Sequence, residues 1–146
     1  MPTIYFDMDG TLSDLFNVPK WQEKLAARDC SPYHMARPLC RPESLKMRLA
    51  RYHADGYNLG IITWCSIGAD AEFEDEVRVA KTEWLKKHDI WKCFDIVHIL
   101  PYGTPKYLFL EHGDILVDDD LGILEQWRKW GGIGVEAKDF FAAEWN

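Results

Sequence analysis

Short apolar runs alternate with segments of helical spacing along the chain, and this alternation constrains the fold more than any other feature of the sequence. Strands are expected at 3–6, 58–63, 95–99, 114–117 and 132–135. Helices are expected over 42–55, 73–88 and 123–130, with a shorter one beginning at Thr104-Pro105. Because a right-handed crossover returns each strand over one face of a sheet, we predict an α/β fold. Its expected form is a Rossmann-like three-layer α/β/α sandwich with a mostly parallel central sheet.

Between the first two expected strands, residues 13–41 contain no clear strand and have three prolines, at positions 19, 32 and 38. A short helical pattern surrounds Trp21, Leu25 and Arg28. We interpret this segment as a small helical cap inserted after the first strand. With 146 residues, the chain is expected to form a single domain, 1–146, that includes the cap.

Composition excludes several classes of function. A net charge of −7 argues against extended binding to a nucleic-acid backbone. The longest uncharged, largely apolar run, 57–69, is too short for a membrane span. The first strand begins at residue 3 and leaves no room for a signal peptide, and four cysteines without a CxxC pair suggest free thiols. We therefore expect a cytoplasmic protein that acts on a small molecule, whose oligomeric state the sequence leaves open.

Two carboxylates, Asp7 and Asp9, end the first apolar strand and are followed at once by Gly10. In a parallel sheet, the carboxyl ends of the strands form the ligand crevice, so both acids are expected where substrates bind. Carboxylates held this close repel each other unless a cation lies between them or one is protonated. Both arrangements are useful in catalysis.

A second acidic strand end, Asp118-Asp119-Asp120, follows the fourth expected strand. Mg²⁺ prefers oxygen ligands and commonly takes one or two carboxylates together with water and a phosphate. We predict a Mg²⁺ site formed by Asp7, the backbone carbonyl of Asp9, and the Asp118-Asp119 pair. Alternation of side chains along a strand leaves open which of that pair is the ligand. Asp120 is the least favoured of the three acids.

Two further positions are suited to holding an anion. Thr63 ends the second strand, so its hydroxyl and the backbone amide of Trp64 after it can donate hydrogen bonds to phosphate oxygens. Lys106 follows Thr104-Pro105, a candidate helix start, where the helix dipole and the lysine charge would both attract an anion.

These motifs, in this order, resemble those of the haloacid dehalogenase-like (HAD) hydrolases, a family of mostly Mg²⁺-dependent phosphatases. The resemblance covers about residues 3–135, from Asp7-Met8-Asp9-Gly10-Thr11 through Thr63 and Lys106 to Asp118-Asp119. It implies that Asp7 attacks phosphorus and forms an aspartyl phosphate, and that Asp9 serves as general acid and then as general base. It also implies that Lys106 and Mg²⁺ neutralise negative charge, while Thr63 and the following amides hold the phosphate.

The small cap, the loop after Thr63 and the Asp118-Asp119 strand end look most similar to the 5′(3′)-deoxyribonucleotidases, small-cap nucleotide phosphatases. Aromatic residues of the cap and of the core loops are suited to stacking on a base: Phe16, Trp21, Tyr33, Trp64 and Tyr102. The segment 115–140 also resembles phosphatase domains that act on polynucleotide 3′ ends. A nucleotide phosphomonoesterase is the leading hypothesis. A polynucleotide 3′-phosphatase, a sugar-phosphate phosphatase and a non-catalytic Mg²⁺- or phosphate-binding module are the alternatives.

Overall fold

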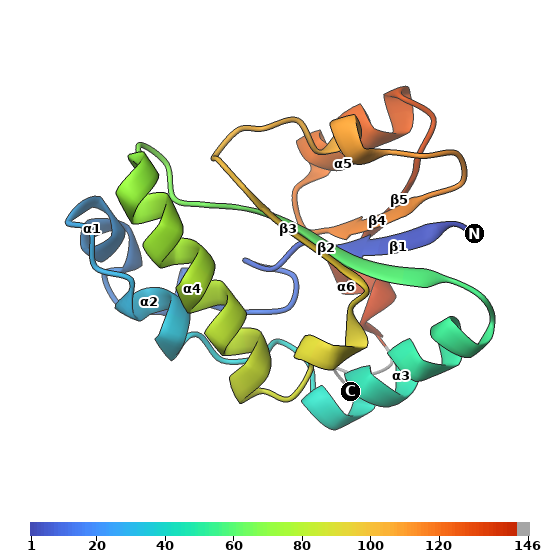
Figure 1. Cartoon of the computed structure of the whole chain (residues 1–146), viewed down its shortest axis with the longest axis horizontal. Coiled ribbons are helices and arrows are strands. Elements are labelled where there is room, and N and C mark those ends of the chain that lie inside the picture. The colour runs from blue at the N-terminus through green and yellow to red at the C-terminus, as the bar shows by residue number, and fades with distance from the viewer. Residues whose placement is uncertain (143–146) are drawn as a thin grey trace.

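The computed structural model describes residues 1–142 and contains a five-stranded, all-parallel sheet in the order β3-β2-β1-β4-β5 (Figure 1). The expected α/β fold with three layers is confirmed. The strands are β1 (Thr3–Phe6), β2 (Asn58–Trp64), β3 (Ile96–Leu100), β4 (Ile115–Asp118) and β5 (Ile133–Glu136). Each lies within a residue or two of the position expected from the sequence.

The helices cover both faces of the sheet (Figure 1). They are α1 (Trp21–Ala26), α2 (Ser31–Met35), α3 (Pro42–Ala54), α4 (Ala71–Lys87), α5 (Leu121–Lys129) and α6 (Ala137–Phe140), with 3-10 turns η1 (Leu15–Asn17), η2 (Trp91–Cys93) and η3 (Lys106–Phe109). Local sequence explains several of the helix starts. Pro42 opens α3, and the Asp70 carboxylate caps α4 by accepting a 2.8 Å hydrogen bond from the Phe73 amide.

The chain changes faces at the centre of the sheet. Helices α3 and α4, which connect β1 to β2 and β2 to β3, pack on one face, whereas η3 and α5, which connect β3 to β4 and β4 to β5, pack on the other. The switch therefore falls between the adjacent strands β1 and β4. In an open parallel sheet, the crevice outside the carboxyl ends of two such strands is the usual ligand site. Asp7 and Asp118 lie at those two ends.

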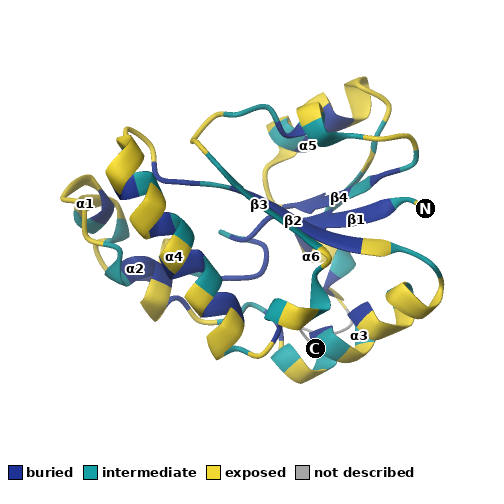
Figure 2. Cartoon of the chain, in the orientation of Figure 1, coloured by how far each residue is buried: buried dark blue, intermediate teal, exposed yellow. Residues whose placement is uncertain are grey.

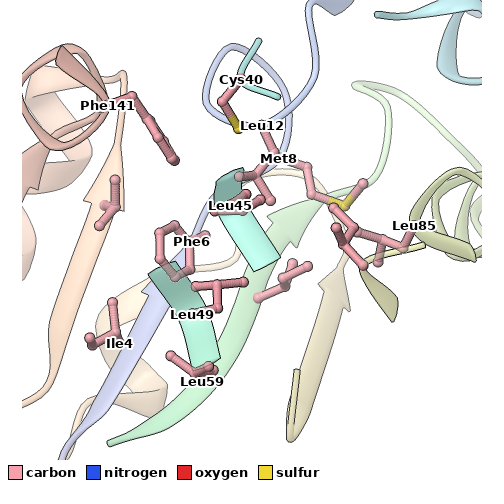
Figure 3. Close-up of a cluster of buried hydrophobic side chains, with 14 of the residues drawn as sticks. Ile4, Phe6, Met8, Leu12, Cys40, Leu45, Leu49, Leu59, Leu85 and Phe141 are labelled. Carbon is pink, nitrogen blue, oxygen red and sulfur yellow. The ribbon is translucent and has the colours of Figure 1, made fainter. Parts of the chain in front are cut away.

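The largest apolar cluster lies between the sheet and α3. Figure 3 shows Ile4 and Phe6 of β1 beside Leu45 and Leu49 of α3, and Phe6 and Leu49 are completely buried. Burial of such side chains stabilises the fold by about 1.5–3 kcal/mol each. On the opposite face, Trp127 of α5 packs with the strands beneath it, so both faces of the sheet are covered (Figure 2).

The expected cap packs closely on the rest of the protein. Helix α2 lies beside α4 (Figure 1), and the cap side chains Leu25 and Tyr33 share an apolar cluster with Phe73 and Val77 of α4. The Trp84 indole on α4 also donates a 2.8 Å hydrogen bond to the Ala36 carbonyl. These contacts fix the position of the cap relative to the carboxyl edge of the sheet.

The segment between β3 and β4 differs from the helix expected there. A helix was expected to begin at Thr104-Pro105, but the structure has only the 3-10 turn η3, and the Thr104 hydroxyl donates to the Pro101 carbonyl instead of capping a helix. Lys106 therefore begins a short 3-10 turn and not an α-helix. After β5, Phe141 is fully buried, whereas Trp145 lies outside the described residues.

Within residues 1–142, no helix has both the length and the apolar character to cross a membrane. Three of the four cysteines, Cys30, Cys65 and Cys93, have free thiols, as the sequence suggests. Cys40 and Cys65 are buried, and Cys30 and Cys93 are half-buried.

Asp114, another acid near the sheet, has a structural role. Its buried carboxylate accepts hydrogen bonds from the Thr3 amide at 2.8 Å and from the Glu111 amide at 2.9 Å, which ties the start of β1 to the turn before β4. We expect Asp114→Ala to lower the free energy of unfolding by about 3 kcal/mol, because two amide donors lose their acceptor. Urea unfolding measures the change, with Asp139→Ala at an exposed helix position as control. Equal midpoints for the two variants would contradict this role.

Candidate functional site

An acidic cluster lies where β1 and β4 end. Asp7, Asp118 and Asp119 each place a carboxylate oxygen within 4.8 Å of the others. Asp7 and Asp118 are buried, whereas Asp119 is exposed. Asp120 is directed away from the cluster, because its side chain caps α5 by accepting from the amides of Gly122 and Ile123. The structure thus brings both members of the Asp118-Asp119 pair to Asp7.

Lys106 lies between two of these acids. Its buried ammonium donates to Asp7 at 3.0 Å and to Asp118 at 2.8 Å. Burial alone would lower the pKa of Lys106, but the two carboxylates outweigh that effect and raise it above its usual value. Lys106 therefore remains a cation, and it neutralises part of the charge of the cluster.

Asp9 turns away from the cluster, toward a lysine that the sequence analysis did not select. Lys81 of α4 is 1% exposed and donates to Asp9 Oδ2 at 2.8 Å, to Thr63 Oγ1 at 2.8 Å and to the Trp64 carbonyl at 2.7 Å. One fifth of the Asp9 side chain remains exposed. Burial raises the pKa of Asp9, whereas Lys81 acts in the opposite direction.

A signal for Lys81 was present in the sequence. Lys81 lies four residues after Val77 and three before Trp84, at the spacing of the buried face of α4. A lysine on an apolar stripe must find a partner when it is buried. Its partner Asp9 lies 72 residues away in the chain, so helical spacing alone does not identify the ion pair.

Thr11 and Gly10 shape the side of the cluster that carries Asp119. The buried Thr11 hydroxyl lies 3.2 Å from Asp119 Oδ1 and 3.4 Å from Asp7 Oδ2. Gly10 has a positive φ of 82°, and a Cβ atom there would lie 2.3 Å from Asp119 Oδ2. Glycine is therefore required both by the backbone conformation and by the close approach of the carboxylate.

We expect Gly10→Ala to impair binding of a metal ion beyond any loss of stability. Positive φ costs a non-glycine residue about 1–2 kcal/mol, and the added methyl group must also displace Asp119. Gly131→Ala is the matched control, because Gly131 has a φ of 95° and nothing within 4 Å of its Cβ position. Unfolding and Mg²⁺ titrations of both variants separate backbone strain from crowding. Identical Mg²⁺ affinities would show that Asp119 is not displaced.

The charges of the cluster favour a cation. Burial, followed by the charge of Asp7, raises the pKa of Asp118, and partial burial together with Asp7 and Asp118 raises the pKa of Asp119. The raised pKa values mean that ionising both carboxyl groups costs free energy while no metal cation lies beside them. Lys106 supplies one positive charge to three acids, and a divalent cation would remove the remaining repulsion.

The donor set fits Mg²⁺. Three carboxylates from two adjacent strand ends supply hard oxygen ligands, and the exposure of Asp119 leaves room for water or a phosphate oxygen. The carboxylate of Asp9 is not part of this group, since it pairs with Lys81. The backbone carbonyl of Asp9, the ligand proposed from the sequence, therefore stays a prediction.

A cavity of about 440 Å³ opens above the cluster, which is within the usual size range of small-molecule sites. Asp7, Asp9, Thr63, Lys106 and Asp118 are all among its lining residues. Five aromatic residues selected from the sequence line it as well: Phe16, Trp21, Tyr33, Trp64 and Tyr102. Charged residues at the strand ends (the charged floor) and these five aromatic residues (the aromatic wall) therefore line one cavity.

Contacts hold the aromatic wall in place. The Trp64 indole donates a 2.7 Å hydrogen bond to the Thr104 carbonyl and packs against Tyr102 with ring centres 5.0 Å apart. Phe16 and Trp21 of the cap meet edge to face at 5.1 Å. Phe16 is about half exposed, so part of this apolar surface is free for a ligand.

Comparison with known proteins assigns no family: no protein-family model matches the chain, and no curated protein matches it significantly in sequence.

Proposed function

We propose that the protein is a Mg²⁺-dependent phosphomonoesterase of the HAD type that acts through an aspartyl-phosphate intermediate. The observation that carries this proposal is the convergence of Asp7, Lys106 and the Asp118-Asp119 pair at the switch point between β1 and β4. Asp9 and Thr63 line the same cavity. A nucleophile, a candidate general acid, a buried cation and a phosphate-binding hydroxyl thus surround one space.

In the proposed reaction, an Asp7 oxygen attacks phosphorus while the ester oxygen departs, and the Asp9 carboxyl gives that oxygen its proton. Water then attacks the phosphorus of the aspartyl phosphate while Asp9 takes a proton from the water, and the bond from Asp7 to phosphorus breaks, which releases inorganic phosphate and restores the Asp7 carboxylate. Lys106 stabilises the added negative charge, and the Thr63 hydroxyl holds a phosphoryl oxygen. When bound, Mg²⁺ would be held by Asp7, Asp118 and Asp119 and would supply Lewis-acid stabilisation of the phosphoryl group.

The aromatic wall supports a nucleotide as the substrate. A planar base stacked on Trp64, Tyr102 or the cap aromatics would lie above the charged floor that receives the phosphate. The net charge of −7 and the limited size of the cavity favour a small phosphate ester over a long nucleic acid. The proposed place of action remains the cytoplasm.

Phosphate release from a substrate panel tests the function and selects the substrate. The panel contains 5′- and 3′-deoxynucleotides, a 3′-phosphorylated oligonucleotide and several sugar phosphates, each assayed with and without Mg²⁺. We expect Mg²⁺-dependent release that is fastest with a mononucleotide. Preference for the oligonucleotide would favour a polynucleotide 3′-phosphatase, and preference for a sugar phosphate would favour a sugar-phosphate phosphatase. Binding of Mg²⁺ and phosphate without release of product from any ester would favour the non-catalytic module.

A further inference from the structure

Lys81 has no hydrogen-bond donor left for a substrate. An ammonium group carries three N–H donors and no acceptor. In the structure, these three donors have three acceptors: Asp9 Oδ2, Thr63 Oγ1 and the Trp64 carbonyl, all within 2.8 Å. With 1% exposure, Lys81 is also shielded from the cavity, whose lining residues do not include it. It is therefore placed to act through its neighbours.

The bond from Lys81 determines what the Thr63 hydroxyl can do. A hydroxyl has one donor, and its oxygen accepts from other donors. Because Thr63 Oγ1 accepts from Lys81, its own proton points away from the ammonium and is left for another acceptor. Thr63 is completely buried but is among the residues that line the cavity, where a phosphoryl oxygen would be such an acceptor. Without Lys81, this bond no longer fixes the direction of the hydroxyl proton.

The same ammonium distinguishes the two oxygens of Asp9. Oδ2 accepts from Lys81 at 2.8 Å, whereas Oδ1, among the described residues, has a long contact of 3.4 Å with the Ser13 hydroxyl. Lys81 thus occupies Oδ2, and Oδ1 is the oxygen of Asp9 left to exchange a proton with a ligand. The ion pair also keeps the carboxyl apart from the cluster formed by Asp7, Asp118 and Asp119.

We propose that Lys81 is a positioning residue for phosphoryl transfer, which orients the Asp9 carboxyl so that Oδ1 carries the transferable proton and directs the Thr63 hydroxyl toward phosphate. This inference rests on the proposed function. The proposed role belongs to a residue of helix α4, which lies outside the motifs at the strand ends. The packing of the Tyr33 ring 5.0 Å from the Lys81 ammonium links this arrangement to the cap.

Leaving-group dependence tests the proposal. Phenyl phosphate releases a weakly acidic phenol that benefits from a proton, whereas 2,4-dinitrophenyl phosphate releases a phenol acidic enough to depart as an anion. The comparison uses kcat/KM, which reports on the steps up to phosphoryl transfer. We expect Lys81→Met to lower kcat/KM by on the order of 10²-fold for phenyl phosphate and by less than about tenfold for the dinitrophenyl ester. A general loss of structure would lower both alike.

Three further variants complete the design. Lys87→Met, at an exposed position on the same helix, is the control for removal of a lysine. Lys81→Gln keeps a polar side chain of similar length and covers the case in which Lys81→Met fails to fold; we expect the same selectivity with a smaller loss. Asp9→Asn should show the largest difference between the two esters, because it removes the transferable proton itself. The inhibition constant of inorganic phosphate should rise severalfold in Lys81→Met if Thr63 loses its orientation.

The outcomes separate this inference from the proposed function. If the wild-type protein hydrolyses neither ester with Mg²⁺ and none of the substrate panel, the proposed function fails, and the positioning role fails with it. If the wild type is active and both Lys81 variants lose the same factor on both esters, only the role of Lys81 is overturned. Selective loss on phenyl phosphate that Asp9→Asn shares supports it.

Discussion

Asp7→Asn is expected to lower kcat/KM by on the order of 10⁴-fold or more while leaving the protein at least as stable as the wild type. The loss follows from the proposed chemistry, since an amide oxygen is a poor nucleophile toward phosphorus. The residue also keeps its size, so the cavity and the contacts around β1 are preserved. A large loss of rate without a loss of fold is characteristic of a residue that takes part in the reaction.

The expected stability follows from the charges around Asp7. Asp7 gains an ion pair with Lys106 at 3.0 Å, but it also lies beside two further carboxylates, Asp118 and Asp119. Removing one of three negative charges leaves Lys106 paired with Asp118 and reduces the repulsion. We therefore expect an unchanged or higher Tm in the absence of Mg²⁺, together with weaker stabilisation when Mg²⁺ is added.

Thermal unfolding with and without Mg²⁺, together with phosphate release, measures these effects. Asp55→Asn is the matched control, because Asp55 is exposed and precedes β2, at the opposite edge of the sheet. Incubation with a substrate carrying labelled phosphate should label the wild type covalently and leave Asp7→Asn unlabelled. Normal turnover by the Asp7→Asn variant would show that the Asp7 carboxylate is not the nucleophile.

The positions of the strands and the convergence of most candidate residues could be predicted from the sequence. Apolar runs bounded by turns specify strands locally, and parallel strands bring their carboxyl ends to one edge. Asp7 and Asp118 therefore meet although 111 residues separate them, as the parallel pairing of β1 with β4 requires. Strand alternation could not select between Asp118 and Asp119. In the structure both reach Asp7, Asp118 at the strand end and Asp119 in the loop after it.

Tertiary contacts determined the rest of the site. Lys81 was not selected: helical spacing places it on the apolar face of α4, but only tertiary packing identifies its partners Asp9 and Thr63. The setting of Lys106 was predicted for the wrong reason: its environment is a pair of carboxylates and the 3-10 turn η3, rather than a helix N-terminus. In both cases the lysine is buried and pairs with an acid far away in the chain, Asp9 for Lys81 and Asp7 for Lys106.

Lys106→Met is expected to combine a loss of activity with a loss of stability, in contrast to Asp7→Asn. The ammonium bridges two buried carboxylates, at 3.0 Å for Asp7 and 2.8 Å for Asp118. Removing one partner of a buried ion pair typically costs about 3–5 kcal/mol, because the opposite charge stays buried without compensation. We also expect kcat/KM to fall by on the order of 10²-fold or more, since the cation no longer stabilises the phosphoryl oxygens.

Added Mg²⁺ should reduce the difference in Tm between Lys106→Met and the wild type. If lysine and metal neutralise the same carboxylates, the Tm of Lys106→Met should rise more with Mg²⁺ than the Tm of the wild type does, because the variant has lost its internal counter-ion. Thermal unfolding over a Mg²⁺ titration measures this difference, with Ca²⁺ as a second hard cation and Lys87→Met as the lysine control. Parallel titration curves for Lys106→Met and the wild type would mean that the metal binds elsewhere. A steeper rise in the variant would place Mg²⁺ and Lys106 on one set of acids, at the switch point between β1 and β4.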